Sequence, residues 1–162
     1  MKSEYLIPLK RRRENKTNYK KRLALLKSEG TRLVIRKSLS NMMVQFVDFN
    51  VKGDQTVACA FSTELKKLGW EKTGNLPAAY LTGLLAGKKA REKKIESAVL
   101  DLGLQTSTKG SRLYAALRGV IDSGVNVPHS EKVLPSEDRI KGKHISEEIV
   151  KKFDEVKSKI KG

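Results

Sequence analysis

Between residues 31 and 61, three apolar runs predict β-strands over 31–37, 42–50 and 55–61. The first has Leu33, Val34 and Ile35 at its centre, the second alternates apolar and polar residues with the two-residue repeat of a strand, and the third is small and apolar. In the middle strand one face carries Val44, Phe46 and Asp48, and the other carries Met43, Gln45, Val47 and Phe49. The connections are short and Lys52-Gly53-Asp54 is typical of a turn, so the three strands are expected to form an antiparallel meander.

From residue 62 onward the pattern favours helices. Ser62 or Thr63 is placed to cap a short helix that ends at Gly69, and Asn75 with Pro77 opens a longer helix running to about residue 93. A further helix over 110–123 stops at Gly124. The long helix is expected to lie close on the sheet because several of its residues are small: Ala78, Ala79, Gly83, Ala86 and Gly87.

A helix over 17–28 is also predicted before the first strand. Gly30 suits the left-handed position that follows a helix, and Leu23 with Leu26 supplies an apolar face expected to pack on the domain. The first turns are basic, although basic residues near a helix N-terminus oppose the helix dipole. Phosphates of a partner would explain why these residues are tolerated there.

The short apolar run over 98–102, between two helices, is interpreted as a buried strand. A parallel strand reached through a helix implies a right-handed crossover. The predicted fold is therefore α/β, with a mixed sheet of about four strands (the antiparallel meander plus one parallel strand) packed with helices. A basic N-terminal extension and a helical C-terminal tail complete the chain.

The length of 162 residues favours one domain with a core of its own. Residues 1–14 are interpreted as a basic arm that orders only on a partner, 15–127 as an α/β RNA-binding domain, and 128–162 as a C-terminal loop and helix. Ser146 is a good helix start. The helix after it is expected to dock on the domain or on another protein through a stripe of apolar residues: Ile149, Val150, Phe153, Val156 and Ile160.

Charge indicates the class of partner. The chain carries a net charge of +16, and residues 1–40 hold 13 Lys or Arg against three Asp or Glu. Such a protein repels itself unless polyanions neutralise it, and nucleic acid is the polyanion that the pattern favours. A membrane surface is the rival, but no lipidation signal, leader-like segment or apolar stretch near eighteen residues is present. The protein is expected to be intracellular.

Other chemistry receives little support. Cys59 is the sole cysteine and has apolar neighbours, so a buried, inert thiol is expected, and with His129 and His144 it makes no zinc signature. Trp70 is interpreted as a partly buried anchor for its loop rather than a stacking platform. Backbone N–H groups before the helix at 110, with Lys109 and Arg112, would suit a phosphate. An ordinary polar capping loop is the equal alternative.

A metal-dependent nuclease is the alternative from another class. Asp48, Asp101 and Asp122 fall at or near the ends of predicted elements, and three converging carboxylates would bind two magnesium ions. Sequence spacing does not show convergence, so the positions of these side chains decide the matter. Asp101 and Asp122 are more often caps or partners of Arg112 or Arg118.

Several stretches, in order over about residues 5–145, resemble a known family. They are residues 11–19 (RRRENKTNY), 22–23, 32–36, 68–70, 75–83 (NLPAAYLTG), 100–104, 109–111, 115–119 and 127–129. Each is weak alone, but together they resemble the archaeal and eukaryotic branch of the large-subunit ribosomal protein family numbered eighteen in the bacterial series. Cys59, where a small hydroxyl residue is usual, and the apolar segment 7–9 depart from that pattern.

The resemblance implies a non-enzymatic, cytoplasmic protein without cofactor, metal, membrane or small-molecule substrate. It would bind 5S rRNA and help attach it to the large-subunit rRNA at the central protuberance, beside the other 5S-binding large-subunit protein. Tyr5 and Tyr19 are candidates for stacking on bases or bonding to sugars. The residues expected to contact RNA are Arg11, Arg12, Arg13, Lys16, Tyr19, Lys20, Arg22, Arg32, Arg36, Ser38, Asn41, Gln45, Lys109 and Arg112.

Overall fold

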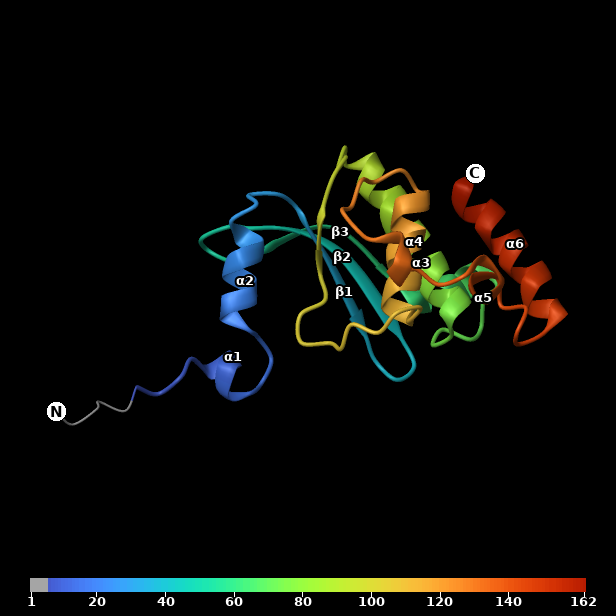
Figure 1. Ribbon diagram of the computed structural model, residues 1–162. Coiled ribbons are helices and arrows are strands. Elements are labelled where there is room, and N and C mark those ends of the chain that lie inside the picture. Colours follow the sequence, from blue (N-terminus) through green and yellow to red (C-terminus); the bar gives the residue numbers. More distant parts are fainter. Residues whose placement is uncertain (1–5) are drawn as a thin grey trace.

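The computed structural model describes residues 6–162, so Tyr5, one of the two tyrosines expected to stack on RNA, lies outside the described residues. Within this range no helix has the length and apolar character needed to cross a membrane. The chain forms a sheet with helices against one face, and a separate short helix beside the other face (Figure 1).

Four strands form the sheet, in the order β3-β2-β1-β4. β1 pairs antiparallel with β2 and parallel with β4, and β2 pairs antiparallel with β3, with a register shift between Phe46 and Val47. The predicted meander and the parallel strand are both confirmed, and the predicted ends lie within two residues of those observed. The strands span Arg32–Lys37 (β1), Met42–Asp48 (β2), Gln55–Phe61 (β3) and Val99–Asp101 (β4).

Two long helices cover one face of the sheet, α3 (Leu76–Glu92) and α4 (Arg112–Asp122). The α3 helix begins as predicted, because the side chain of Asn75 accepts a hydrogen bond from the backbone N–H of Ala78 at 2.9 Å. Gly124, with φ +96°, follows the end of α4. Alternate residues of β1 and β2, including Leu33, Ile35 and Phe46, are fully buried beneath these helices.

Two of the small residues of α3, Gly83 and Gly87, face α4 and the residue after it rather than the sheet, which corrects the prediction for these two positions. A Cβ added at Gly83 would overlap the backbone oxygen of Ala116, and one added at Gly119 would overlap the backbone oxygen of Tyr80. The two helix backbones therefore approach at reciprocal glycines. No local pattern distinguishes a small residue that faces a sheet from one that faces another helix.

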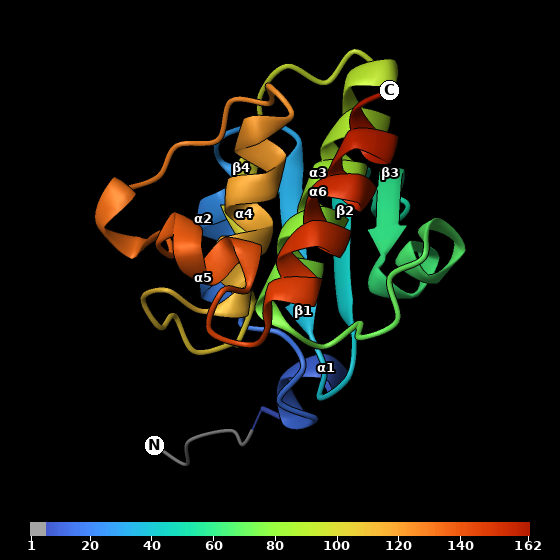
Figure 2. The same cartoon turned by 90° about the vertical axis from the view of Figure 1, so that its right-hand side faces the viewer.

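The C-terminal segment packs on the helical layer. It contains η2 (Glu131–Val133), α5 (Glu137–Lys141) and α6 (Glu147–Lys161), and α6 lies outermost over α3 (Figure 2). Ser146 caps α6 by accepting from the N–H of Ile149. Phe153, Val156 and Ile160 are buried, and the Phe153 ring centroid lies 5.4 Å from that of Tyr80. The apolar stripe thus contacts this chain's own domain.

The short helix η1 (Ser62–Leu68) shows how one local prediction failed and another held. Its N-cap is Phe61, whose N–H donates to the Glu64 carboxylate, while the Ser62 hydroxyl instead accepts from the N–H of Met42. Gly69, with φ +95°, ends the helix as predicted.

Three single-residue predictions also have clear outcomes. Trp70 is buried and donates from Nε1 to the carbonyl of Lys72 at 2.9 Å, so it anchors its loop as expected. Cys59 is only half-buried, because β3 turns Ala58 and Ala60 toward the core and Cys59 toward the opposite face. The left-handed residue after the helix at 19–26 is Glu29, with φ +53°, and not Gly30.

Candidate nucleic-acid interface

The N-terminal region lies beside the sheet face that α3 and α4 leave uncovered (Figure 1). It contains a single helical turn, α1 (Lys10–Arg13), and the helix α2 (Tyr19–Leu26). Residues 6–16 are all exposed. Asn18 caps α2 by accepting from the N–H of Lys21 at 3.1 Å, and Arg11 Nε donates to the Thr17 hydroxyl at 2.8 Å. That residues 1–14 order only on a partner stays a prediction.

An ion pair joins α2 to the sheet, and the expectation that Leu23 packs there is wrong, although Leu26 is half-buried. Leu23 is 61% exposed and α2 has no buried residue. Arg22 instead donates from both Nη atoms to the two carboxylate oxygens of Asp54, at 2.7 and 2.8 Å. Asp54 comes from the turn between β2 and β3, so a paired guanidinium and carboxylate set the position of α2.

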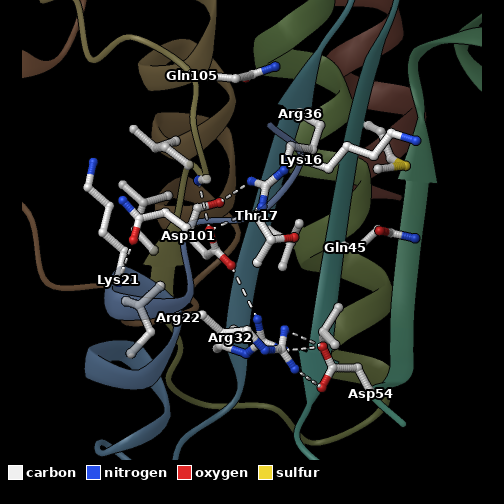
Figure 3. Close-up of a pocket in the computed structure, with 18 of the residues that line it drawn as sticks. Lys16, Thr17, Lys21, Arg22, Arg32, Arg36, Gln45, Asp54, Asp101 and Gln105 are labelled. Carbon is white, nitrogen blue, oxygen red and sulfur yellow. Dashed lines mark hydrogen bonds and ion pairs between the residues drawn. The ribbon is translucent and has the colours of Figure 1, made fainter. Parts of the chain in front are cut away.

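The ion pair continues across the sheet as a network (Figure 3). Arg32, buried at the start of β1, donates to Asp54 at 2.6 Å and to Asp101 of β4 at 3.2 Å. Arg36 donates to the other carboxylate oxygen of Asp101 at 3.1 Å, and that oxygen also accepts from the N–H of Gly103. Three arginines thus surround two aspartates, which leaves the network positively charged.

The hydrogen bonds of the network shift the pKa values of Asp54 and Arg22. The hydrogen bonds from Arg22, and then from Arg32, hold the pKa of Asp54 below its ordinary value of 3.8, against the opposing effect of burial. The same pairing raises the pKa of Arg22. Asp54 is therefore ionised at neutral pH and remains a partner for both arginines.

A cleft of about 750 Å³ lies between α2 and the open face of the sheet. Its walls carry six basic side chains (Arg11, Lys16, Lys21, Arg22, Arg32 and Arg36) and two acidic ones (Asp54 and Asp101). Alternate residues of β1 and β2 line its floor: Val34, Met43, Gln45 and Val47.

The predicted RNA-contacting residues divide into three groups. Arg11, Lys16, Arg22, Arg32, Arg36 and Gln45 line the cleft, while Arg12, Arg13, Tyr19 and Lys20 lie on the exposed outer surface of α1 and α2. Four others do not line the cleft: Ser38, Asn41, Lys109 and Arg112. The structure therefore brings together the N-terminal group and the sheet group, but not the loop before α4.

Two of these residues hold the fold instead of facing a ligand. Arg32 is only 2% exposed and both its Nη atoms are paired, so it is not available for direct RNA contact. Arg112 donates to the carbonyls of Gly74 at 2.6 Å and Leu39 at 3.2 Å, and so ties the β1–β2 turn to α4. Arg112 is therefore engaged within the protein, and the phosphate site expected from it together with Lys109 stays a prediction.

Sequence reasoning missed several residues of the cleft. Lys21, Met43, Asp54 and Asp101 line it, and so does Gln105, whose amide bonds both the N–H and the carbonyl of Lys37. The one available signal was a carboxylate, Asp101, inside a short apolar strand, which requires a buried cationic partner. The identity of that partner is a tertiary property.

The carboxylates required for a nuclease are engaged separately. Asp101 pairs with Arg32 and Arg36, Asp48 accepts from Thr31, and Asp122 pairs with Arg118 and accepts from the Tyr80 hydroxyl at 2.8 Å. Burial, and then Asp122, raise the pKa of Tyr80, so this phenol stays a donor. Over residues 6–162, no three His, Cys, Asp or Glu side chains gather as a metal site. The nuclease hypothesis is abandoned.

Comparison with known proteins gives one consistent result. The family described as "Ribosomal large subunit proteins 60S L5, and 50S L18" matches residues 3–96 and 89–130. Relatives named "Large ribosomal subunit protein uL18" include one from Korarchaeum cryptofilum, 55% identical over 88% of this chain and 73% of its own length. The relative from Methanococcoides burtonii is 49% identical over 96% of this chain and 94% of its own length. The relative from Natronomonas pharaonis is 54% identical over 88% of this chain and 78% of its own length.

Proposed function

Because the chain belongs to the family of large-subunit ribosomal proteins that includes 60S L5 and 50S L18, we propose that it binds 5S rRNA and helps attach it to the large-subunit rRNA at the central protuberance. Proteins of this family are structural components of the large ribosomal subunit, so the chain is a ribosomal protein and not an enzyme. Its partners would include neighbouring ribosomal proteins, among them the other 5S-binding protein of the large subunit.

The observation that carries the proposal is the convergence of the basic arm, α2 and the open sheet face on one cleft. Arginine side chains match the geometry of phosphate oxygens, and six basic side chains against two acidic ones create a local excess of positive charge there. Arg12, Arg13 and Lys20 extend this charge over the exposed surface beside the cleft. An RNA backbone lying along α1 and α2 would neutralise the positive charge of the cleft and that of the surface beside it.

The resemblance of the sequence names 5S rRNA, and the arrangement of the site suits a structured RNA. Phosphate contacts would set the affinity and fix the orientation of the protein on the RNA. Tyr19, on α2 and 36% exposed, is available to stack on a base or to bond to a sugar. No bond is made or broken, so each residue has a positional role.

The test measures affinity for 5S rRNA against salt concentration, with an unrelated folded RNA of equal length as the control. Counterion release predicts that log affinity falls steeply with log salt, by about 0.7–0.9 for each phosphate neutralised. The protein should bind 5S rRNA more tightly than the control at every salt concentration. Equal affinity for both RNAs would contradict the choice of 5S rRNA, and a flat salt dependence would contradict phosphate contact.

A matched pair of variants locates the surface. Replacing Arg11, Arg12 and Arg13 by alanine should reduce 5S rRNA affinity and the salt slope together. Replacing Lys151, Lys152 and Lys161, all exposed on α6, removes the same charge on the other side of the helical layer. The second triple variant should retain most of the affinity. Equal losses in the two would show that net charge alone, and not the cleft side of the molecule, determines binding.

A further inference from the structure

The floor of the cleft differs chemically from its rim. Val34 and Val47 are apolar and almost completely buried, and half-buried Met43 lies on the same face, opposite Arg36 in the strand register. Binding a phosphate against such a floor would be unfavourable, because the phosphate would lose its hydrogen bonds to water and the apolar side chains offer none in return. The basic residues instead lie around the rim, on α2 and on the arm that precedes it.

Gln45 stands at the centre of this floor with unused hydrogen-bonding capacity. It is half-buried in the middle of β2, and its amide has no partner among the hydrogen bonds of the described residues. Gln105, by contrast, uses both ends of its amide on the backbone of Lys37. A free amide offers one acceptor and two donor hydrogens, which match the edge of a nucleobase.

The adjacent wall also contains an unused donor. Arg32 is paired through both Nη atoms, but its buried Nε has no hydrogen-bond partner. An unpartnered buried N–H is uncommon, but protein atoms cover this one and it does not open into the cleft. The cleft itself therefore combines an apolar floor, a free amide and a cationic rim.

We infer that the cleft binds an unpaired nucleotide of the RNA, with the base over Val34, Met43 and Val47 and its edge at the Gln45 amide. This inference rests on the proposed function and specifies which part of the RNA occupies the site. The phosphates on either side of that nucleotide lie at the rim, near Lys21 and Arg22. The volume of about 750 Å³ is in the range of sites for ligands of nucleotide size, about 300–1,000 Å³.

Paired RNA does not suit the same site. An A-form helix keeps its base edges inside the grooves and presents sugar and phosphate at its surface, so a duplex leaves the apolar floor uncovered. Unpaired nucleotides in loops and bulges expose both the face and the edge of the base. The cleft thus contributes selectivity for an unstacked nucleotide, while the arm contributes affinity that does not depend on sequence.

The experiment uses the full chain and two RNA hairpins with the same number of nucleotides, one fully paired in its stem and one with a single unpaired nucleotide in the stem. The bulged hairpin should bind about tenfold more tightly. Removing only the base of the unpaired nucleotide should abolish that advantage, and this comparison needs no change in the protein. If the paired, bulged and abasic hairpins bind equally, the inference is overturned.

Protein variants provide the second readout. Gln45→Leu keeps the size and charge of the side chain, and it should lower affinity for the bulged hairpin about fivefold to tenfold with an unchanged salt slope. Gln55→Leu, on the exposed start of β3 and outside the cleft, is the control and should change neither.

The two proposals fail in distinguishable ways. If Gln45→Leu leaves both hairpins unaffected while 5S rRNA still binds with a steep salt slope, the inference is wrong and the proposed function stands. If the wild-type chain does not select 5S rRNA over the unrelated RNA, the proposed function is wrong, whatever the hairpins show.

Discussion

The two faces of the sheet are covered in opposite ways. On one face α3 and α4 pack against buried strand residues and approach each other at Gly83 and Gly119 with no room for a Cβ. On the other face α2 buries no residue, and its connection to the sheet is the paired Arg22 and Asp54. Dense apolar contact makes the first face rigid, whereas a partly exposed ion pair leaves the second adjustable.

This difference indicates that the two faces have different roles. The face covered by α3 and α4, here called the helical face, supplies most of the free energy of folding. The face beside α2, here called the ionic face, supplies charge and a cleft. Substitutions on the first face should therefore change the stability of the protein, and those on the second should change RNA affinity and the order of α2.

The largest expected effect is on the packed face. Gly119→Ala places a Cβ against the backbone oxygen of Tyr80, and neither backbone moves easily. We expect a loss of roughly 3 kcal/mol in the free energy of unfolding, which outweighs the gain of about 1 kcal/mol from the helix propensity of alanine. Denaturant unfolding measures it. Gly30→Ala, where the nearest atom lies 3.7 Å away, should stay within about 0.5 kcal/mol of wild type; equal effects of the two would contradict close packing.

Asp54→Asn should lower the free energy of unfolding less than Gly119→Ala does. It removes a partner from Arg22 and from buried Arg32, although Arg32 keeps Asp101. The Asp54 side chain is 27% exposed, so we expect a loss of about 2 kcal/mol or less. Hydrogen exchange of the amides of 19–26 should accelerate more than that of α3. Asp48→Asn, which changes net charge equally, should leave α2 unchanged, and if it does not, the ion pair is not what positions the helix.

Deletion of residues 1–14 should separate affinity from folding. The deletion removes five basic and two acidic side chains, and residues 6–14 have no buried member. Affinity for 5S rRNA should fall at least about tenfold and the salt slope should shrink. The melting temperature of the free protein should change by no more than about 2 °C. A large loss of melting temperature at constant salt slope would mean that the arm belongs to the core.

The smallest effect concerns pH. The pKa of Asp54 is lower in the folded protein than its ordinary value of 3.8, so its contribution to stability is complete above 3.8 and is lost as the pH falls through the lowered pKa. Hydrogen exchange or NMR of 19–26 between pH 7 and pH 2 should show α2 loosening only below about pH 4. In Asp54→Asn this dependence should disappear; if it persists, another carboxylate is responsible.

Much of the fold was predictable because local patterns determine it. The small apolar run over 55–61 matches β3, and Asn75 with Pro77 begins α3 where predicted. The burial of Arg32 was not predictable, because an arginine at the first position of a strand is usually exposed to solvent. Its partners lie 22 and 69 residues away in sequence. The partner of Gly83 is also distant in sequence, and for this reason Gly83 was expected to face the sheet and not α4.

The candidate site was predicted in part. Basic composition identified the arm and α2, and strand alternation separated Gln45, Met43 and Val47 from the face of Val44 and Phe46 without showing which face is open. Asp54 was missed as a partner of the arginines, and Asp101 was expected to cap a helix or to pair with Arg112 or Arg118, whereas it pairs with Arg32 and Arg36. Whether a basic residue is available to a ligand depends on such pairing, which only the tertiary structure reveals.

The position of β4 at the far edge of the sheet has a consequence for biosynthesis. Its partner strand β1 is made long before it, and the buried Arg32 and Asp101 are separated by 69 residues. At roughly 5–20 residues per second, a translating ribosome needs about 3–14 s to make that interval. Throughout this time the growing polypeptide carries its most basic segment without the carboxylate of Asp101. Polyanions therefore have several seconds in which to compete with the completion of folding for the same arginine.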